Sequence, residues 1–221
     1  MKNARQIIFV FMLWTLMIQA IWANKNVDML VDSAIKGDLF KVKSLLEQCK
    51  SVNAKTHNGY TALILVAGAG NLEVVKLLID KGANVNAKDD SGGSALMNAS
   101  SAGKLDIAKY LIAKGADIKA VDNNGFTALM VASMAGHLEI AEFLIAKGAD
   151  VNMRVEVGAF KGASALIFAS LKGHLDIVKL LIAKGANVNA KMKNGKTALS
   201  VAKTNEIKEI LHNAMKKSRV L

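Results

Sequence analysis

Histidine, cysteine and carboxylate side chains are the groups from which this 221-residue chain could build a catalytic or metal site. The candidates are His57, His137, His174, His212 and a single cysteine, Cys49. Zinc sites draw on three or four such ligands, commonly in pairs at short spacing, and the sequence contains neither a closely spaced His pair nor a Cys pair. The sequence therefore predicts no metal ion, no cofactor and no catalytic residue.

Several of these groups recur at a fixed step along the chain. His137 and His174 both follow a glycine at the same place in their segments. Carboxylates return in the same way, at Glu73, Asp106, Glu139 and Asp176. We expect each carboxylate in the first turn of a helix, where a negative charge is stabilised by the helix dipole. Recurrence at such a place predicts a structural role for both sets.

Two tripeptides show that the whole chain is periodic. Thr61-Ala62-Leu63 returns with Ser or Thr first at Ser94, Thr127, Ser164 and Thr197, in steps of 33, 33, 37 and 33 residues. Lys-Gly-Ala keeps the same step from Lys81, Lys114, Lys147 and Lys184. Two markers in phase predict one supersecondary unit stacked on copies of itself as an elongated solenoid. Such a solenoid has a long surface and seldom a deep catalytic pocket.

One unit shows how the elements should follow one another. Asn58-Gly59 is a turn signal, and Thr61 is expected to cap a short helix that ends at Gly70. A second, amphipathic helix should begin near Asn71 and end at Gly82. The extended segment that follows, with the next turn, is called a finger. Each unit is therefore predicted to be turn, helix, helix and finger.

The motifs of the unit resemble those of the ankyrin repeat family. They are Asn124-Gly125-Phe126-Thr127-Ala128-Leu129, Gly136-His137-Leu138-Glu139-Ile140 and Lys147-Gly148-Ala149-Asp150-Val151-Asn152. The resemblance covers about residues 25–221, although the family's Thr-Pro-Leu-His becomes Thr/Ser-Ala-Leu and the chain has no proline. It implies an all-α ankyrin-repeat solenoid of stacked helix-turn-helix units with β-turn fingers. It also implies that fingers and first helices line a concave face that binds protein partners.

The expected domain, residues 24–221, contains six units. They are an N-terminal cap (25–55), full repeats (56–88, 89–121, 122–154 and 155–191) and a C-terminal cap (192–221). The glycine between the helices is missing from the C-terminal cap, and we expect a shortened last helix over residues 206–215.

The first 23 residues differ from the rest. A basic start at Lys2 and Arg5 precedes an apolar run over residues 7–18, and Ala23 before Asn24 suits cleavage. This layout predicts a signal peptide (1–23) and a periplasmic or secreted protein. The alternative is an uncleaved membrane anchor, since residues 7–23 just reach the lower end of the roughly 17–25 residues that span a bilayer.

The chain is basic, with 29 Lys and Arg against 18 Asp and Glu, and about +9 in formal charge without the leader. A basic surface can attract nucleic acid. Many lysines, however, occupy repeat-fixed positions, and the chain has no Arg-rich cluster or series of aromatic residues for stacking bases. We therefore expect neither nucleic acid nor a small-molecule substrate as the partner.

Exposed positions that vary between units are where a solenoid carries specificity. Those beside the turn glycines and before the inter-helix glycines are His57, Tyr60, Asp90, Asn123, Phe126, Met134, Phe160, Lys161, Leu171, Lys172, Lys193 and Lys196. Tyr60, Phe126 and Phe160 are the expected anchors, since aromatic residues are favoured at interface hot spots. The alternative is that each packs on a neighbouring finger.

Four extra residues between Asn152 and Ser164 account for the step of 37. Insertions in repeat proteins map to loops on one face, often the binding face, which favours partner contact by Phe160 and Lys161 at the tip. A neutral insertion is the alternative, because lengthening a loop costs only a few tenths of a kcal/mol.

The sequence thus predicts an exported, monomeric, non-enzymatic protein-binding scaffold. The alternatives are an accessory or regulatory protein of a periplasmic enzyme, or a protein that self-associates through a cap or finger ridge.

Overall fold

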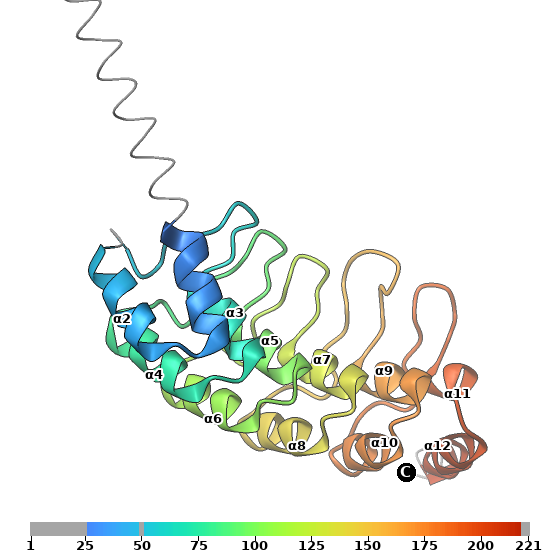
Figure 1. The fold of residues 1–221 in the computed structure, drawn as a ribbon. Coiled ribbons are helices and arrows are strands. Elements are labelled where there is room, and N and C mark those ends of the chain that lie inside the picture. The colour runs from blue at the N-terminus through green and yellow to red at the C-terminus, as the bar shows by residue number, and fades with distance from the viewer. Residues whose placement is uncertain (1–25, 49–50, 218–221) are drawn as a thin grey trace, which may run out of the picture.

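The computed structural model describes residues 26–48 and 51–217, and the helices within these ranges stack as pairs along a curved solenoid (Figure 1). The predicted signal peptide, with its cleavage between Ala23 and Asn24, lies outside the described residues. Within them, no helix has both the length and the apolar character that crossing a membrane requires. The predicted all-α class is confirmed.

Each pair contributes one helix to an inner row and one to an outer row (Figure 1). Residues 26–36 are helical and precede α2 (Leu39–Gln48). The inner row is α3 (Ala62–Ala69), α5 (Ala95–Ser101), α7 (Ala128–Ala135), α9 (Ala165–Lys172) and α11 (Ala198–Val201). The outer row is α4 (Leu72–Asp80), α6 (Leu105–Ala113), α8 (Leu138–Ala146), α10 (Leu175–Ala183) and α12 (Asn205–Lys217).

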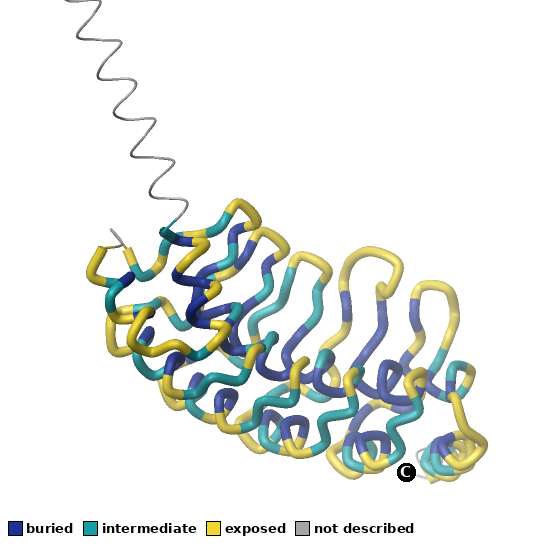
Figure 2. The backbone as a smooth tube through the Cα atoms, in the orientation of Figure 1, coloured by how far each residue is buried: buried dark blue, intermediate teal, exposed yellow. Residues whose placement is uncertain are grey.

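Fingers project from the inner row, and their tips are exposed while parts of their sides are buried (Figure 2). The first to fifth fingers comprise residues 51–61, 83–94, 116–127, 149–164 and 186–197. Isolated antiparallel bridges close two of them, from Lys88 to Ser94 and from Lys191 to Thr197. The fingers and the inner helices together form the face that the sequence predicted to bind partners.

The inner helices begin at capping hydroxyl groups. The Thr61 side chain accepts a hydrogen bond from the backbone N–H of Ile64 at 3.3 Å, which satisfies an otherwise unpaired donor of the first turn. Ser94, Thr127 and Thr197 do the same, whereas Ser164 makes no such bond. Gly70, with φ 97°, ends α3 in the left-handed conformation. The predicted cap and stop are both confirmed.

Small and branched apolar residues fill the space between the rows. Leu63, Leu96, Leu129 and Leu166, which recur once per unit, are each 1% exposed. Alanines such as Ala67 and Ala99 are fully buried on the inner helices and let neighbouring helices approach closely. Buried residues form one core cluster that reaches from Leu30 to Leu211. Truncating one such leucine to alanine costs about 2–5 kcal/mol.

In three units, the residue after the inter-helix glycine reaches back to the preceding unit. Asn71 Nδ2 donates to the carbonyl oxygen of Ile35 at 2.6 Å. His137 Nε2 lies 3.0 Å from the carbonyl oxygen of Ser101, and His174 Nε2 lies 3.1 Å from that of Met134. These contacts confirm the structural role predicted for His137 and His174.

The last helix lies where it was predicted, but the expectation that it is shortened is wrong. The helix α12 has 13 residues, against nine in α10, and the short element is α11 with four. Thr204 begins α12 early, because its hydroxyl accepts from the backbone N–H of Ile207. No Lys-Gly-Ala stop follows, so α12 continues to Lys217, where basic side chains suit the helix C-terminus.

Candidate partner-binding surface

An asparagine clamp joins the sides of neighbouring fingers. Asn53 Nδ2 donates to the carbonyl oxygen of Gly82 at 3.1 Å, and its Oδ1 accepts from the backbone N–H of Asn84 at 2.7 Å. The same clamp recurs at Asn86 with Gly115 and Asp117, and at Asn152 with Gly185 and Asn187. At the equivalent position of the third finger, Lys119 replaces the asparagine.

Cationic side chains form a second link between fingers. Lys55 Nζ donates to the carbonyl oxygen of Lys88 at 2.7 Å, and Lys88 Nζ donates to that of Val121 at 2.9 Å. Arg154 makes the same link from the fourth finger to the carbonyl oxygen of Lys191 in the fifth. The repeat position that carries Lys or Arg in these three fingers carries Val121 in the third.

Backbone hydrogen bonds tie the fingertips. Asn123 N donates to the carbonyl oxygen of Ser91 at 2.8 Å, and Asn123 Nδ2 donates to that of Asp90 at 2.9 Å. Lys193 N donates to the carbonyl oxygen of Lys161 at 2.8 Å. Four of the predicted partner-binding residues thus also hold neighbouring fingers together. Within the described residues, none of these three kinds of link joins the third finger to the fourth.

Phenylalanine rings hold the third and fourth fingers together instead. Phe126, in the third finger, stacks on Phe168 of α9 with ring centroids 5.1 Å apart. Phe160, in the fourth finger, meets Phe126 at 5.9 Å and Phe168 at 5.6 Å, edge to face in both cases. These three residues are called the phenylalanine cluster. It supports the alternative that Phe126 and Phe160 pack on their neighbours, although Phe160 stays 43% exposed.

Phe168 is the member of the cluster that the sequence analysis missed. It is 1% exposed, and it occupies a first-helix position filled by Leu65, Asn98 and Val131 in other units. Because the residue type at this position differs between units, the sequence alone could have identified Phe168 as a candidate. Only the variable positions beside the turn glycines and before the inter-helix glycines were considered as candidates, so this position was not included.

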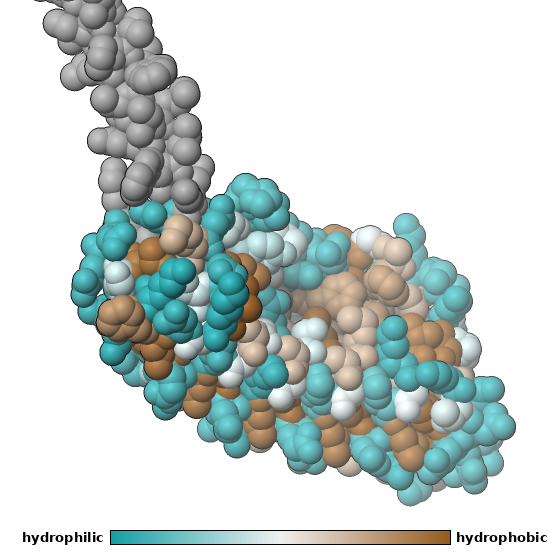
Figure 3. All heavy atoms as spheres, in the orientation of Figure 1, coloured by the Kyte–Doolittle hydropathy of each residue, from teal (hydrophilic) through white to brown (hydrophobic). Residues whose placement is uncertain are grey.

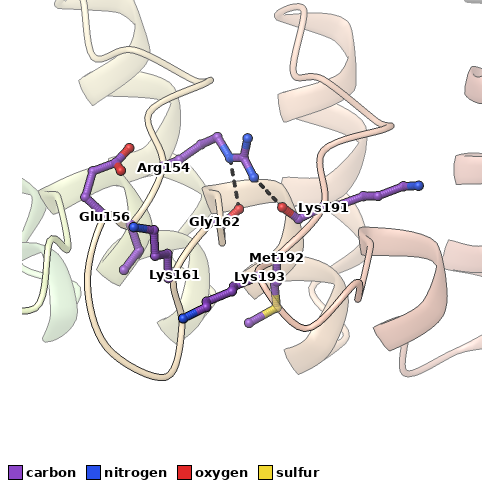
Figure 4. Close-up of a pocket in the computed structure, with 8 residues that line it drawn as sticks. Arg154, Glu156, Lys161, Gly162, Lys191, Met192 and Lys193 are labelled. Atoms are coloured by element: carbon purple, nitrogen blue, oxygen red, sulfur yellow. Dashed lines mark hydrogen bonds between the residues drawn. The ribbon is translucent and has the colours of Figure 1, made fainter.

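The insertion forms a closed hairpin. Val155 N donates to the carbonyl oxygen of Ala163 at 2.9 Å, and Gly162 N donates to that of Val155 at 2.7 Å. Arg154 Nε donates to the carbonyl oxygen of Gly162 at 3.1 Å, so the guanidinium group braces the hairpin from within (Figure 4). Residues 157–162 make the turn, and from it Phe160 folds back onto the phenylalanine cluster.

A surface pocket of about 260 Å³ separates the fourth and fifth fingers. Its lining residues are Arg154, Val155, Glu156, Lys161, Gly162, Lys191, Met192 and Lys193. Lys161 and Lys193 enter it from different fingers, whereas the amine of Lys191 points away (Figure 4). A second pocket, of about 170 Å³, lies between the third and fourth fingers beside Lys119 and Asp150, where the asparagine clamp is missing.

Family models confirm the architecture. One described as ankyrin repeats (3 copies) matches residues 30–122 and 89–155, and one described as ankyrin repeats (many copies) matches residues 129–182 and 166–214. The chain belongs to the ankyrin repeat family. Ankyrin repeats are in general protein–protein interaction modules and are typically non-catalytic scaffolds. None of the curated proteins compared with this ankyrin-repeat chain matches it.

The predicted partner-binding residues divide by burial and by place along the ankyrin stack. The exposed ones are His57, Asp90, Asn123, Phe160, Lys161, Leu171, Lys172, Lys193 and Lys196, and the half-buried ones are Tyr60, Phe126 and Met134. The structure brings Phe126 next to Phe160, and Lys161 next to Lys193. His57 and Tyr60 belong to the first finger and lie apart from this group (Figure 1).

The described part of the chain contains no cluster of potential metal ligands, and the lysine whose pKa is raised lies on an outer helix. No group of three or more His, Cys, Asp or Glu residues there could hold a metal ion. Glu73 raises the pKa of Lys76 above its ordinary value through a 2.8 Å hydrogen bond and its negative charge. Both residues lie on α4, in the outer row, and their i,i+3 pair stabilises that helix.

Proposed function

We propose that this ankyrin-repeat protein is a non-enzymatic scaffold that binds a protein partner through its fingers and inner helices. The observation that carries the proposal is the distribution of exposed large hydrophobic residues. Beyond the N-terminal unit, those in the described residues are Met153, Val157, Phe160 and Leu171. All four lie in the fourth finger and the α9 helix that follows it. Exposed apolar residues gathered in one place mark interaction sites.

The surroundings of this patch suit an interface. Hydrophobic side chains gather below the hydrophilic tips of the fingers (Figure 3). Lys161, Lys172 and Lys193 are exposed beside the apolar residues, as polar rim residues are around an apolar interface core. The fourth and fifth fingers therefore form the centre of the proposed surface, with Met134 and the second and third fingers at its edge.

Partner capture tests this proposal, and the chain supplies a matched control. Phe160-Lys161 and Phe40-Lys41 are the same exposed dipeptide, one in the fourth finger and one in the N-terminal unit. We expect Phe160→Ala/Lys161→Ala to lose the captured partner while circular dichroism stays unchanged. Phe40→Ala/Lys41→Ala should retain the partner. Retention by the first variant, or equal loss by both, contradicts a binding surface at the fourth finger.

Export is the second part of the proposal, supported by the basic start and apolar run of residues 1–23. The mature protein would begin at Asn24 and act in the periplasm or outside the cell, or remain membrane-anchored through residues 7–23 if uncleaved. The intact mass of the protein, isolated from the cells that produce it, shows whether residues 1–23 are cleaved. A mass that includes the first 23 residues, together with membrane fractionation, favours the anchor. A captured partner that is an enzyme of that compartment would make the protein its accessory.

Self-association is the alternative that a specific observation favours. The N-terminal unit exposes Met29, Ile35, Leu39 and Phe40, and Phe40 is 85% exposed. A solenoid end with apolar residues in water could bury them against a second copy. Light scattering over a concentration series should then show dimers that Phe40→Lys dissociates. A monomer at all concentrations removes this alternative.

A further inference from the structure

Most of the excess positive charge of the chain lies in one part of the solenoid. Residues 154–203 contain nine basic and two acidic residues, a formal charge of +7. Residues 56–153 contain eight basic and ten acidic residues, a formal charge of −2. The repeat-fixed lysines therefore do not explain the excess, because they occur in both parts. The fourth and fifth fingers and the helices around them carry most of it.

Within the described residues, the cations that line the pocket between the fourth and fifth fingers form no ion pair. The ion pairs in the described residues are Lys36–Asp32, Lys76–Glu73 and Lys179–Asp176. Lys161 and Lys193 form none of them, and the pocket that they line contains one carboxylate, Glu156. Like charges held close together produce a positive potential that attracts an anionic ligand.

A backbone hydrogen bond fixes the positions of the two fingers that carry these lysines. The backbone bond from Lys193 N to Lys161 O joins the two fingers directly beside the lysine side chains. Arg154 is occupied by the carbonyl oxygens of Gly162 and Lys191, so it fixes the shape of the pocket. The ammonium groups of Lys161 and Lys193 are left to meet a ligand (Figure 4).

Exposed apolar residues lie directly beside these cations in the sequence. Phe160, 43% exposed, precedes Lys161, and Leu171, 42% exposed, precedes Lys172. A ligand that pairs with Lys161 and extends beyond the pocket can also reach the neighbouring ring of Phe160. Carboxylates alone would leave this ring in water, so the complementary ligand combines acidic and apolar groups.

Nucleic acid fits this surface less well than a peptide segment. Sequence-tolerant binders of single strands stack successive bases on free aromatic faces. Here Phe126 and Phe168 stack on each other, and the guanidinium group of Arg154 is already hydrogen-bonded. The available features are point charges on lysines and the partly exposed ring of Phe160.

We propose that the fourth and fifth fingers bind an acidic protein segment in which carboxylates alternate with aromatic or aliphatic side chains. The carboxylates pair with Lys161 and Lys193, and an apolar side chain packs on Phe160. This inference rests on the proposed protein-binding function and names the chemistry of the partner.

Fluorescence anisotropy with a labelled peptide of three Glu-Glu-Phe repeats tests the inference on the purified protein. We expect saturable binding that weakens several-fold when salt rises from about 0.05 to 0.5 M, because the attraction is screened. A Gln-Gln-Phe peptide, which lacks the charges, and a Glu-Glu-Ser peptide, which lacks the anchors, should each bind about tenfold more weakly. Failure of the first peptide to bind, or equal binding of all three, overturns the inference.

Charge reversal locates the site. Lys161→Glu/Lys193→Glu should weaken peptide binding by about tenfold or more. Lys43→Glu/Lys109→Glu makes the same change in net charge on helices α2 and α6, away from the fingers, and should change affinity less than about twofold. Equal loss in both variants shows a non-specific effect of net charge and overturns the site. Tighter binding of a thymidine 12-mer than of the peptide, lost in the same variant, overturns the peptide assignment in favour of nucleic acid.

Failure of the peptide-binding experiment can be distinguished from failure of the partner-capture experiment. If Phe160→Ala/Lys161→Ala loses its natural partner but no acidic peptide binds, the scaffold proposal stands and the acidic-segment inference fails. If that variant keeps its natural partner, the scaffold surface itself is misplaced and both proposals fail.

Discussion

Lys88 Nζ donates a hydrogen bond to the carbonyl oxygen of Val121 at 2.9 Å, and Val121 has no side-chain donor with which to continue the link to the fourth finger. The asparagine clamp is lost at the same junction, because Lys119 stands at its position. The polar links that join the other fingers therefore stop between the third and fourth. The phenylalanine cluster replaces them at the point where the inserted finger begins.

Restoring the clamp should stabilise the protein. In Lys119→Asn, the amide group can donate to the carbonyl oxygen of Gly148 and accept from Asp150 N, as Asn86 does with Gly115 and Asp117. Two recovered hydrogen bonds predict a gain of about 1–2 kcal/mol in the free energy of unfolding. Urea unfolding followed by circular dichroism measures it. Asn86→Lys is the reverse change at an intact junction and should cost a similar amount; no effect in either variant contradicts the clamp.

The phenylalanine cluster should couple the third and fourth fingers energetically. Phe168→Ala removes a buried ring and is expected to destabilise the protein by about 3–5 kcal/mol. A double-mutant cycle between Phe126→Ala and Phe160→Ala should give a coupling energy of about 0.5–1.5 kcal/mol, typical of an edge-to-face pair. Additive losses would show that the two rings contact each other without mutual stabilisation.

The parts of the fold that were predicted correctly depend on residues close together in the sequence. Thr61 caps α3 through Ile64, three residues away, and Gly70 ends it. The clamps and cation links were not predicted, because Lys55 and Lys88 are 33 residues apart and meet only once the units stack. Asparagine and lysine at repeat-fixed positions were visible, but their partners are backbone carbonyls that no sequence pattern marks.

The candidate site was predicted in outline and not in detail. Variable positions beside the turn glycines gave Phe126, Phe160 and Lys161, all of which the structure brings to the third and fourth fingers. Whether an aromatic residue packs or projects depends on its neighbour in space, and here Phe168 supplies that neighbour from the next inner helix. The charge excess in residues 154–203 was countable from the sequence, and its location on adjoining fingers became clear only from the structure.

The shape of the inserted finger should depend on Gly162. Its φ is 86°, and a Cβ atom there would lie 2.8 Å from the carbonyl oxygen of Lys191 and 2.8 Å from Arg154 Nη2. Gly162→Ala is expected to cost more than about 2 kcal/mol through strain and displacement of Arg154. Gly158 also has a positive φ, 69°, but open space around it, so Gly158→Ala should cost about 1 kcal/mol. Equal losses by thermal unfolding would show that packing at Gly162 adds nothing to the backbone strain.

A substitution at Arg154 can change the shape of the pocket without changing its charge. The planar guanidinium group donates from Nε to Gly162 and from Nη2 to Lys191, two directions that a single ammonium group does not reproduce. Arg154→Lys keeps the positive charge but should lose one brace, with a cost of about 1 kcal/mol in stability. Hydrogen exchange at the Gly162 and Lys193 amides should accelerate, because their bonds to Val155 and Lys161 depend on the braced hairpin. Unchanged exchange in this variant would mean that the two backbone bonds hold the fourth and fifth fingers without the arginine.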